Sequence, residues 1–389
     1  LMIIAIDGLA GSGKTTAGKG LAEAIGFRFI SSGQLYRFKA LKPDVDLLEA
    51  IRGHKLKIEW NIEWEGKDIT EELQREETGN RASQIALLSE VREEVNSALR
   101  FVAEGGNYVI EGRDIGTVVF PEAGVKFFLT ADEKVRARRR AEQVGEEVNI
   151  ADRDERDRKR DIAPAKAAED AVIIDNSDQS VEETIKEMER HLPKDEFDFQ
   201  RFLQYVLGPL VRGLFRVEVV KGHPLKYGRW ILTPNHTSAW DAVCLAASVP
   251  RSPYYVAKEE LRKILGPLLS ILNTVTIVRD TPDLKAIKAI RDLLSKERIV
   301  VIYPESKIFT DGVMGPFKEG AFYFLRKKMA PVVPVVIKGL ERITFNTFFT
   351  RHVRISFLDP VYPVDVLGMK EEFVAAKVKG LMVNAYESM

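Results

Sequence analysis

The chain has 389 residues, of which 45% are hydrophobic and 30% charged, and its formal net charge is zero. This length predicts two or three domains, and the composition is that of a soluble globular protein, which excludes low-complexity and repeat architectures. Cys244 is the only cysteine, which excludes a disulfide framework and favours a reducing cytoplasm. The chain opens on the strand-like Met2–Ile6 without a basic segment or cleavage site, so we expect no secretion signal.

The zero net charge hides an asymmetry between the two halves. The formal charge is about −9 up to Pro193 and about +9 after it. A basic second half predicts an anionic surface as its partner, and both nucleic acid and anionic lipid meet that description.

A phosphate-binding motif follows the first predicted strand, Ile3–Asp7. The sequence Gly8-Leu9-Ala10-Gly11-Ser12-Gly13-Lys14-Thr15 matches G-x-x-x-x-G-K-[ST] and leads into a helix of small residues. Backbone N–H groups of such a loop surround phosphate oxygens, and the lysine reaches the β and γ phosphates. The motif predicts binding of ATP with Mg²⁺, with Thr15 as the metal ligand. The predicted nucleotide-binding residues are Gly8, Gly11, Ser12, Gly13, Lys14, Thr15 and Thr16.

Strands and helices alternate through the rest of the first half. Further strands are predicted at 27–30, 108–111, 125–129 and 171–175, and an alternating segment at 55–70 predicts a small strand pair inserted between helices. This alternation predicts a parallel sheet flanked by helices. Arginines are dense at 136–140 and 153–160. We expect most of them on a solvated helix face and a subset on a segment that closes over transferring phosphate.

Taken together, residues 2 to about 191 resemble bacterial cytidylate (CMP) kinase. Besides the phosphate loop, the likeness rests on Ser32-Gly33 with Tyr36-Arg37, Ala82-Ser83-Gln84, Val91-Arg92-Glu93, the Gly112–Pro121 run and Arg153–Arg158. The resemblance implies transfer of phosphate from ATP to CMP or dCMP, with UMP as a competing acceptor. The implied residues are Ser32, Ser83, Arg92, Arg113 and Asp114 around the cytosine and its phosphate, Arg37 on that phosphate, Asp157 on the ribose, and Arg153 and Arg160 on the phosphates; Lys14, Asp114, Arg153 and Arg160 are the implied catalytic residues.

The first half departs from that family at two places. Ser31 stands where the family usually has an aspartate, and the segment before Arg153 is shortened. The first departure affects base or ribose contacts, and the second affects closure and rate. The predicted domains are 1–193 and 194–389, because Pro193-Lys194-Asp195-Glu196 breaks the helical pattern before a new apolar segment.

The second half contains a histidine and an aspartate in H-x-x-x-x-D spacing. His236 and Asp241 follow the strand-like run 230–234. An imidazole can remove a proton from an attacking hydroxyl, and a carboxylate can fix its tautomer. On this pair alone, a helix cap with a packed histidine is an equal alternative.

Two segments of the second half are apolar but studded with basic residues. Residues 197–216 and 261–272 are interrupted by charges before they reach the length of a membrane span. Each is either a core helix or an amphipathic helix lying in a membrane interface. No nucleic-acid recognition module is present, so an anionic membrane is the expected partner and nucleic acid is not.

Residues from about 215 to 340 resemble the 1-acylglycerol-3-phosphate acyltransferase family. The likeness rests on four blocks in order, at 235–241, 274–279, 299–306 with 315–322, and 330–337. It implies an α/β domain with membrane-facing helices that transfers an acyl group from acyl-carrier protein or coenzyme A to lysophosphatidic acid. His236 is implied as the base and Asp241 as its partner, and the implied glycerol-phosphate contacts are Arg279, Glu305, Ser306 and Lys318.

The third block departs from the family pattern. Ser306 and Lys307 replace the usual glycine and threonine, and no arginine follows at its customary place. A different lysolipid acceptor therefore stays an alternative, as does a non-catalytic module that docks a kinase to a membrane. We expect a cytoplasmic protein associated peripherally with the inner face of the cell membrane, and no zinc site, because the other histidines and Cys244 lack ligand spacing.

Overall fold

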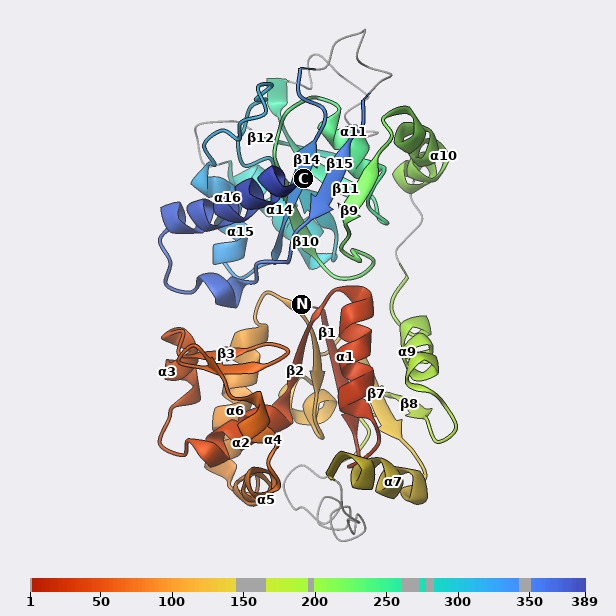
Figure 1. Ribbon diagram of the computed structural model, residues 1–389, viewed down its shortest axis with the longest axis vertical. Helices are drawn as coiled ribbons and strands as arrows, with labels where there is room; N and C mark the ends of the chain where they lie inside the picture. The colour runs from red at the N-terminus through yellow and green to blue at the C-terminus, as the bar shows by residue number, and fades with distance from the viewer. Residues whose placement is uncertain (1, 145–165, 195–198, 261–272, 278–282, 343–350) are drawn as a thin grey trace. The chain divides into compact units, whose positions relative to one another are not determined.

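A computed structural model describes residues 2–144, 166–194, 199–260, 273–277, 283–342 and 351–389. The chain forms two compact units, Met2–Pro193 and Lys194–Met389. Each is an α/β unit (Figure 1), as the sequence predicts.

The first unit is built on a parallel sheet. Its described strands are ordered β2 (Arg28–Ser31), β6 (Asn107–Glu111), β1 (Met2–Gly8), β7 (Val125–Thr130) and β8 (Val172–Asp175), and every neighbouring pair is parallel. All seven residues of the central strand β1 are buried, because a continuous apolar run suits a strand covered on both faces. The expected parallel sheet is confirmed, and its carboxyl edge carries the phosphate loop.

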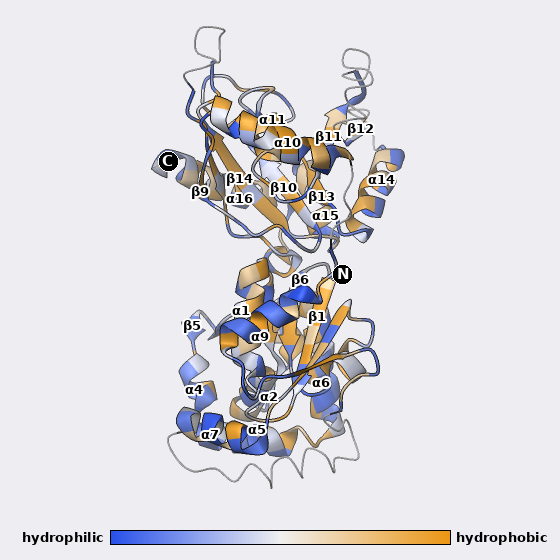
Figure 2. Cartoon of the chain, turned by 90° about the vertical axis from the view of Figure 1, so that its right-hand side faces the viewer, coloured by the Kyte–Doolittle hydropathy of each residue, from blue (hydrophilic) through white to orange (hydrophobic). Residues whose placement is uncertain are grey.

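Helices connect these strands in the first unit. They are α1 (Lys14–Ile25), α2 (Ser32–Leu41), α3 (Leu47–Arg52), α4 (Thr70–Gln74), α5 (Glu76–Ile85), α6 (Ser89–Ala103), the π-helical turn η1 (Ile115–Val119), α7 (Glu133–Val144) and α9 (Val181–Arg190). The expected strand pair is an antiparallel sheet of β3 (Leu56–Ile58) and β4 (Ile62–Trp64), to which the short β5 (Lys67–Asp68) is added. The strands of the parallel sheet are largely hydrophobic, whereas β5, α4, α5 and α7 are largely hydrophilic (Figure 2).

The second unit is built on a mixed sheet. The described strands are ordered β12 (Thr274–Ile277), β11 (Pro253–Lys258), β13 (Ile299–Val301), β10 (Trp230–Pro234), β14 (Val332–Lys338), β15 (Arg354–Phe357) and β9 (Glu218–Lys221). Only the β14–β15 pair is antiparallel among them. Helices α14 (Leu284–Ser295) and α16 (Glu371–Ser388) pack apolar residues against the sheet. The shorter helical elements are α11 (Asp241–Ala246), η2 (Glu319–Phe322), α15 (Tyr323–Arg326) and η4 (Pro363–Val366).

Helix α10 (Phe199–Leu214; Figure 1) exposes several of its apolar side chains. Tyr205 is 80% exposed and Leu210 66%, while the buried positions are Gln200 and Gly208. The core-helix alternative is therefore wrong for this segment, because most of its large apolar side chains are exposed. The second amphipathic candidate, 261–272, lies outside the described residues. None of the described helices is long and apolar enough to cross a bilayer.

Candidate active sites

The phosphate loop of the first unit connects β1 to α1. Gly11 has φ 74° and Gly13 has φ 81°, a backbone region that favours glycine. A Cβ at Gly11 would lie 2.5 Å from the carbonyl oxygen of Arg136, so the close approach of α7 also requires glycine there. The N-cap residue of helix α1 is Gly13, which makes no side-chain cap hydrogen bond. This open helix start and the exposed Thr15 and Thr16 fit a triphosphate with its metal ion.

Lys14 and Thr15 already have contacts around this loop. The Lys14 ammonium donates to the Leu9 carbonyl oxygen at 3.2 Å across the loop. The Thr15 hydroxyl donates to Glu111 Oε1 at 3.2 Å, and the Ser31 hydroxyl donates to the same oxygen. A hydroxyl that donates to a carboxylate keeps its lone pairs for a cation, so Thr15 fits Mg²⁺. Ser12 is buried, and Gly8 lies close to the Leu129 carbonyl, where an added Cβ would stand 2.3 Å from the oxygen.

Asp7 and Glu111 are site residues that the motif search missed. Both end buried strands at the carboxyl edge of the sheet, and a charged residue closing an apolar run is the signal that could have found them. Asp7 accepts the N–H groups of Ile115 and Gly116 at 2.8 and 2.7 Å, which holds the turn after Asp114. Burial raises the pKa of the Asp7 carboxyl to about 6, against the two amide hydrogen bonds, and the neighbouring Asp114 adds to the rise.

The predicted CMP-side residues gather in two groups. Arg92 and Asp114 form a buried ion pair, and Arg113, directly before Asp114, is partly buried. Arg37 donates to the Leu73 carbonyl at 2.7 Å and lies against Gly79, whose carbonyl accepts the Ser83 hydroxyl at 3.0 Å. Ser32, at the start of α2, is buried beside Gly112. The predicted residues Arg153, Asp157 and Arg160 lie outside the described residues.

The arginines of α7 divide between surface and site. Arg138 is exposed and reaches Glu142 at 4.0 Å, as a solvated helix predicts. Arg136 is buried and donates to the Ala10 carbonyl at 3.1 Å, so the surface interpretation is wrong for it. Arg139 also leaves the surface pattern, because it donates to Asn176 at 2.9 Å, and the Asn176 amide in turn donates to the Ser12 carbonyl at 3.0 Å. These contacts hold the phosphate loop against α7.

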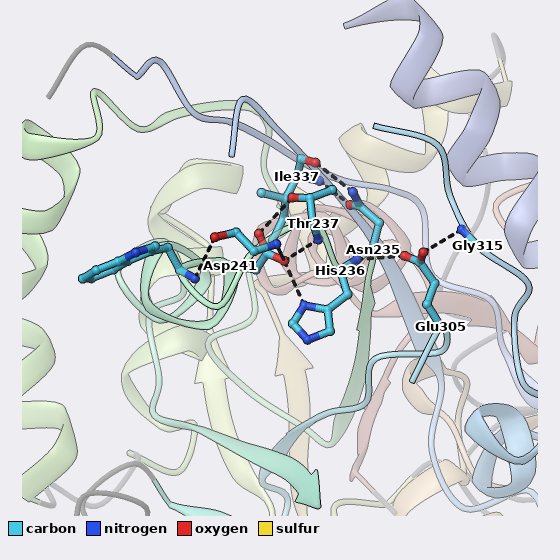
Figure 3. Close-up of polar contacts among 9 residues, drawn as sticks. Asn235, His236, Thr237, Asp241, Glu305, Gly315 and Ile337 are labelled. Carbon is cyan, nitrogen blue, oxygen red and sulfur yellow. Dashed lines mark hydrogen bonds and ion pairs between the residues drawn. The ribbon is translucent and has the colours of Figure 1, made fainter. Parts of the chain in front are cut away.

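In the second unit, His236 and Asp241 meet (Figure 3). His236 Nδ1 lies 3.0 Å from Asp241 Oδ2, so the proton sits on Nδ1 and Nε2 is the basic nitrogen. Asp241 is fully buried, and the same oxygen accepts the backbone N–H groups of Thr237 and Ser238 at 2.7 and 2.9 Å. The start of α11 fixes the carboxylate, and the carboxylate fixes the ring. The expected histidine partner is thus present, whereas the N-cap of α11 is Trp240, which makes no side-chain cap hydrogen bond.

Glu305 joins two loops of this site. Its Oε1 accepts the His236 backbone N–H at 2.8 Å, and its Oε2 accepts the Gly315 N–H at 2.6 Å (Figure 3). Burial raises the pKa of the Glu305 carboxyl, and these two hydrogen bonds oppose the rise. The predicted glycerol-phosphate contact thus has both oxygens on backbone amides, which makes Glu305 a support of the histidine loop in this geometry.

A cavity of about 1100 Å³ lies in front of this pair. Its apolar lining comes largely from α10, α11 and α14, and its polar lining includes His236, Glu305, Ser306 and Lys318. Lys258 and Lys307 also line it, and Lys258 lies outside the four sequence blocks of the family resemblance. The predicted residue Arg279 lies outside the described residues. The arrangement can hold a long apolar group beside a base, with cations near an anionic head.

The fold and the two sites define a two-domain transferase, with a nucleotide-phosphate unit followed by a histidine-dependent unit. Residues 4–194 match the family model for cytidylate kinase. Cytidylate kinases are 36% identical in Nitrosococcus oceani, over 48% of this chain and 93% of the relative, and 40% identical in Thermotoga sp., over 47% and 92%. The chain therefore belongs to the cytidylate kinase family.

The second unit matches a different family model. Residues 216–338 match the model described as acyltransferase. A crystal structure of the 1-acyl-sn-glycerophosphate acyltransferase PlsC from Thermotoga maritima is 21% identical, with a TM-score of 0.40, and covers 52% of this chain and 86% of that one. The chain joins a cytidylate kinase domain to an acyltransferase domain, which makes it a bifunctional enzyme for CMP phosphorylation and acyl transfer.

Proposed function

We propose that the chain phosphorylates CMP or dCMP with ATP and Mg²⁺, and acylates lysophosphatidic acid from a thioester of acyl-carrier protein or coenzyme A at an anionic membrane. The observation that carries the acyl-transfer proposal is the 3.0 Å contact between His236 and Asp241 at the wall of the cavity. An apolar cavity fits an acyl chain, and a base beside it fits activation of a hydroxyl.

In acyl transfer, His236 Nε2 removes the proton of the acceptor hydroxyl. The hydroxyl oxygen attacks the thioester carbonyl, the new C–O bond forms, and the C–S bond breaks as the thiolate leaves. The imidazolium returns its proton to the thiolate. The buried Asp241 carboxylate stabilises the imidazolium and keeps Nδ1 protonated. Because the acceptor oxygen attacks the thioester directly, no acyl-enzyme intermediate is required.

The anionic head of the acceptor fits the cations of the cavity wall. Lys258, Lys307 and Lys318 are the cations among its described lining residues. Lysine is a point charge that holds phosphate without the two-pronged geometry of arginine. Such a wall tolerates a phosphomonoester or a phosphodiester, so lysophosphatidic acid is the first acceptor to test and other lysolipids are the second.

The test is a product assay with His236→Ala and His236→Gln in the full chain. Each acceptor is offered with both thioesters, and CMP phosphorylation in the same preparation serves as the folding control. We expect loss of acylated product by about 10³-fold or more with unchanged kinase activity. An unchanged amount of lipid product in the His236 variants would contradict the assignment of His236 as the base. Absence of acylation in the unsubstituted chain would favour the alternative of a non-catalytic docking module.

For phosphoryl transfer, the residues position reactants and stabilise charge. Lys14 would contact the β and γ phosphates, and Thr15 would hold Mg²⁺, which when bound neutralises phosphate charge. The Arg92–Asp114 pair would orient the acceptor nucleotide, since Arg92 neutralises its phosphate while Asp114 fixes the guanidinium. In-line transfer needs no covalent intermediate. A panel of CMP, dCMP and UMP tests the acceptor, and preference for UMP would contradict the proposal.

Attachment to the inner face of the cell membrane is the third part of the proposal. Its support is the exposed apolar face of α10, whose opposite side lines the cavity through residues such as Leu203 and Val211. A lipid acceptor would then enter the cavity from the surface on which α10 lies.

A further inference from the structure

An aromatic ring covers one face of the proposed base. The ring of Tyr303 stacks on the ring of His236, with centroids 4.1 Å apart and an angle of 29° between the planes. Tyr303 follows β13, and His236 follows β10, its parallel neighbour. Since parallel strands end at the same edge, the two side chains meet where the cavity opens.

The other restraints on His236 act on its backbone and on one edge of its ring. Its backbone N–H donates to Glu305, its carbonyl oxygen accepts the Phe309 N–H at 2.8 Å, and its Nδ1 donates to Asp241. These contacts fix the backbone and one ring atom. A hydrogen bond tolerates some variation in distance and angle, so small joint changes of χ1 and χ2 would still tilt the ring plane and move Nε2 within the cavity. The flat ring of Tyr303 against the imidazole opposes that tilt.

The hydroxyl of Tyr303 contributes little to this arrangement. It is buried and has no hydrogen-bond partner among the described residues. Burial raises the pKa of the Tyr303 hydroxyl well above its ordinary value, and the Asp241 charge adds to the rise. A neutral hydroxyl without a partner neither exchanges protons nor holds a neighbour, so the ring is the functional part of this side chain.

We propose that Tyr303 is a positioning residue for acyl transfer, which holds the imidazole plane so that Nε2 faces the acceptor hydroxyl. This inference rests on the proposed role of His236 as the base. It predicts that any six-membered aromatic ring at this position suffices and that an aliphatic side chain of similar bulk does not.

The test compares Tyr303→Phe with Tyr303→Leu and Tyr303→Met in the full chain. Tyr303→Phe keeps kcat for acyl transfer within about twofold, whereas both aliphatic variants lower it by about 10- to 100-fold with KM values little changed, because misplacement of a base acts on the chemical step. Kinase activity in each preparation reports folding, and using two aliphatic variants keeps the comparison available if one is poorly folded.

A second readout observes the histidine directly. In ¹⁵N-histidine NMR spectra, the Nδ1–H signal of His236, assigned by its loss in His236→Ala, should stay sharp in Tyr303→Phe and broaden in the aliphatic variants. Aliphatic variants with full kcat and a sharp signal would overturn the proposal, and so would a Tyr303→Phe variant as slow as Tyr303→Leu. If His236→Ala itself stays active, the base assignment fails instead, and this outcome is separate from the first two.

Discussion

At the residue scale, buried carboxylates set the geometry of both sites by accepting backbone N–H groups. Asp7 holds the turn at Ile115 and Gly116, and Asp241 holds Thr237 and Ser238. Glu305 holds the backbone of His236 and Gly315. A carboxylate has two oxygens and several lone pairs, so one side chain can fix a loop that has no regular structure. Loop order at these sites therefore depends on single side chains.

Asp7 gives stability a defined pH dependence. Its pKa rises from 3.8 to about 6 on folding, so the folded state binds the proton more tightly than the unfolded state. The stabilising contribution is present below about pH 4 and is lost as pH rises through about 6, a difference of roughly 3 kcal/mol. Chemical unfolding of the full chain should show that the free energy of unfolding falls between pH 4 and pH 7. We expect a smaller fall in Asp7→Asn. Equal slopes in the two proteins would contradict the assignment.

Ser306 is strained where the related family has glycine. Its φ is +62°, a region that costs a non-glycine residue about 1 kcal/mol and a β-branched residue more. Ser306→Gly should be neutral or slightly stabilising, while Ser306→Val should destabilise the second unit by about 1 to 2 kcal/mol. Thermal unfolding of the two variants measures the difference. A valine variant as stable as the glycine variant would refute the strain.

At the element scale, α10 and α16 differ in how much of their apolar surface is buried. Helix α16 buries Val374, Val378 and Met382 against the core, whereas α10 is fixed through Gln200 and Gln204, which donate to carbonyls of the 246–253 segment. Polar contacts help to hold α10 to the unit, and most of its large apolar side chains are exposed, while Leu203 and Val211 line the cavity.

The outward face predicts the determinant of membrane binding. Substituting Tyr205→Asp together with Leu210→Asp in α10 should reduce sedimentation with anionic liposomes at least tenfold, because both side chains would enter the interface. Phe373→Asp is the matched control, because Phe373 is an exposed apolar side chain (58% exposed) near the start of α16. This variant should bind as the unsubstituted chain does. Added salt should weaken binding of the unsubstituted chain. Loss of binding in the control alone would place the surface on α16.

At the scale of the whole molecule, two units with separate cores share one polypeptide. The units meet in sequence at Pro193 and Lys194, and the described contacts of the kinase site all lie within the first unit. The first half is acidic, so its proposed binding of anionic nucleotides would depend on the phosphate loop and on the local arginines, while the basic half suits the proposed anionic surface.

Separate cores predict separable activities. Residues 1–193 expressed alone should fold and phosphorylate CMP with a kcat within about threefold of the full chain, because no residue proposed for this site comes from the second unit. Circular dichroism and a coupled nucleotide assay measure this. A folded but inactive fragment would show that the second unit contributes to kinase chemistry.

The predictable part of the sites is the part carried by short sequence motifs. Gly11, Gly13, Lys14 and Thr15 follow a pattern whose spacing alone dictates a turn and a helix start, and His236 and Asp241 are close enough in sequence for local geometry to join them. Arg136 shows the limit of prediction from local pattern. The sequence of its helix is typical of a surface helix, and the side chain is buried because the phosphate loop lies against it.

The sequence by itself determined the two α/β units, the phosphate loop and the histidine–aspartate pair, since each depends on residues within one strand, turn and helix. Only the tertiary structure decided that Glu111 meets Thr15, that Glu305 holds His236, that Tyr303 covers its ring, and that α10 faces outward. The first three contacts join residues 67 to 96 positions apart. The order of strands in a sheet, which no local pattern encodes, decides which strand ends become neighbours.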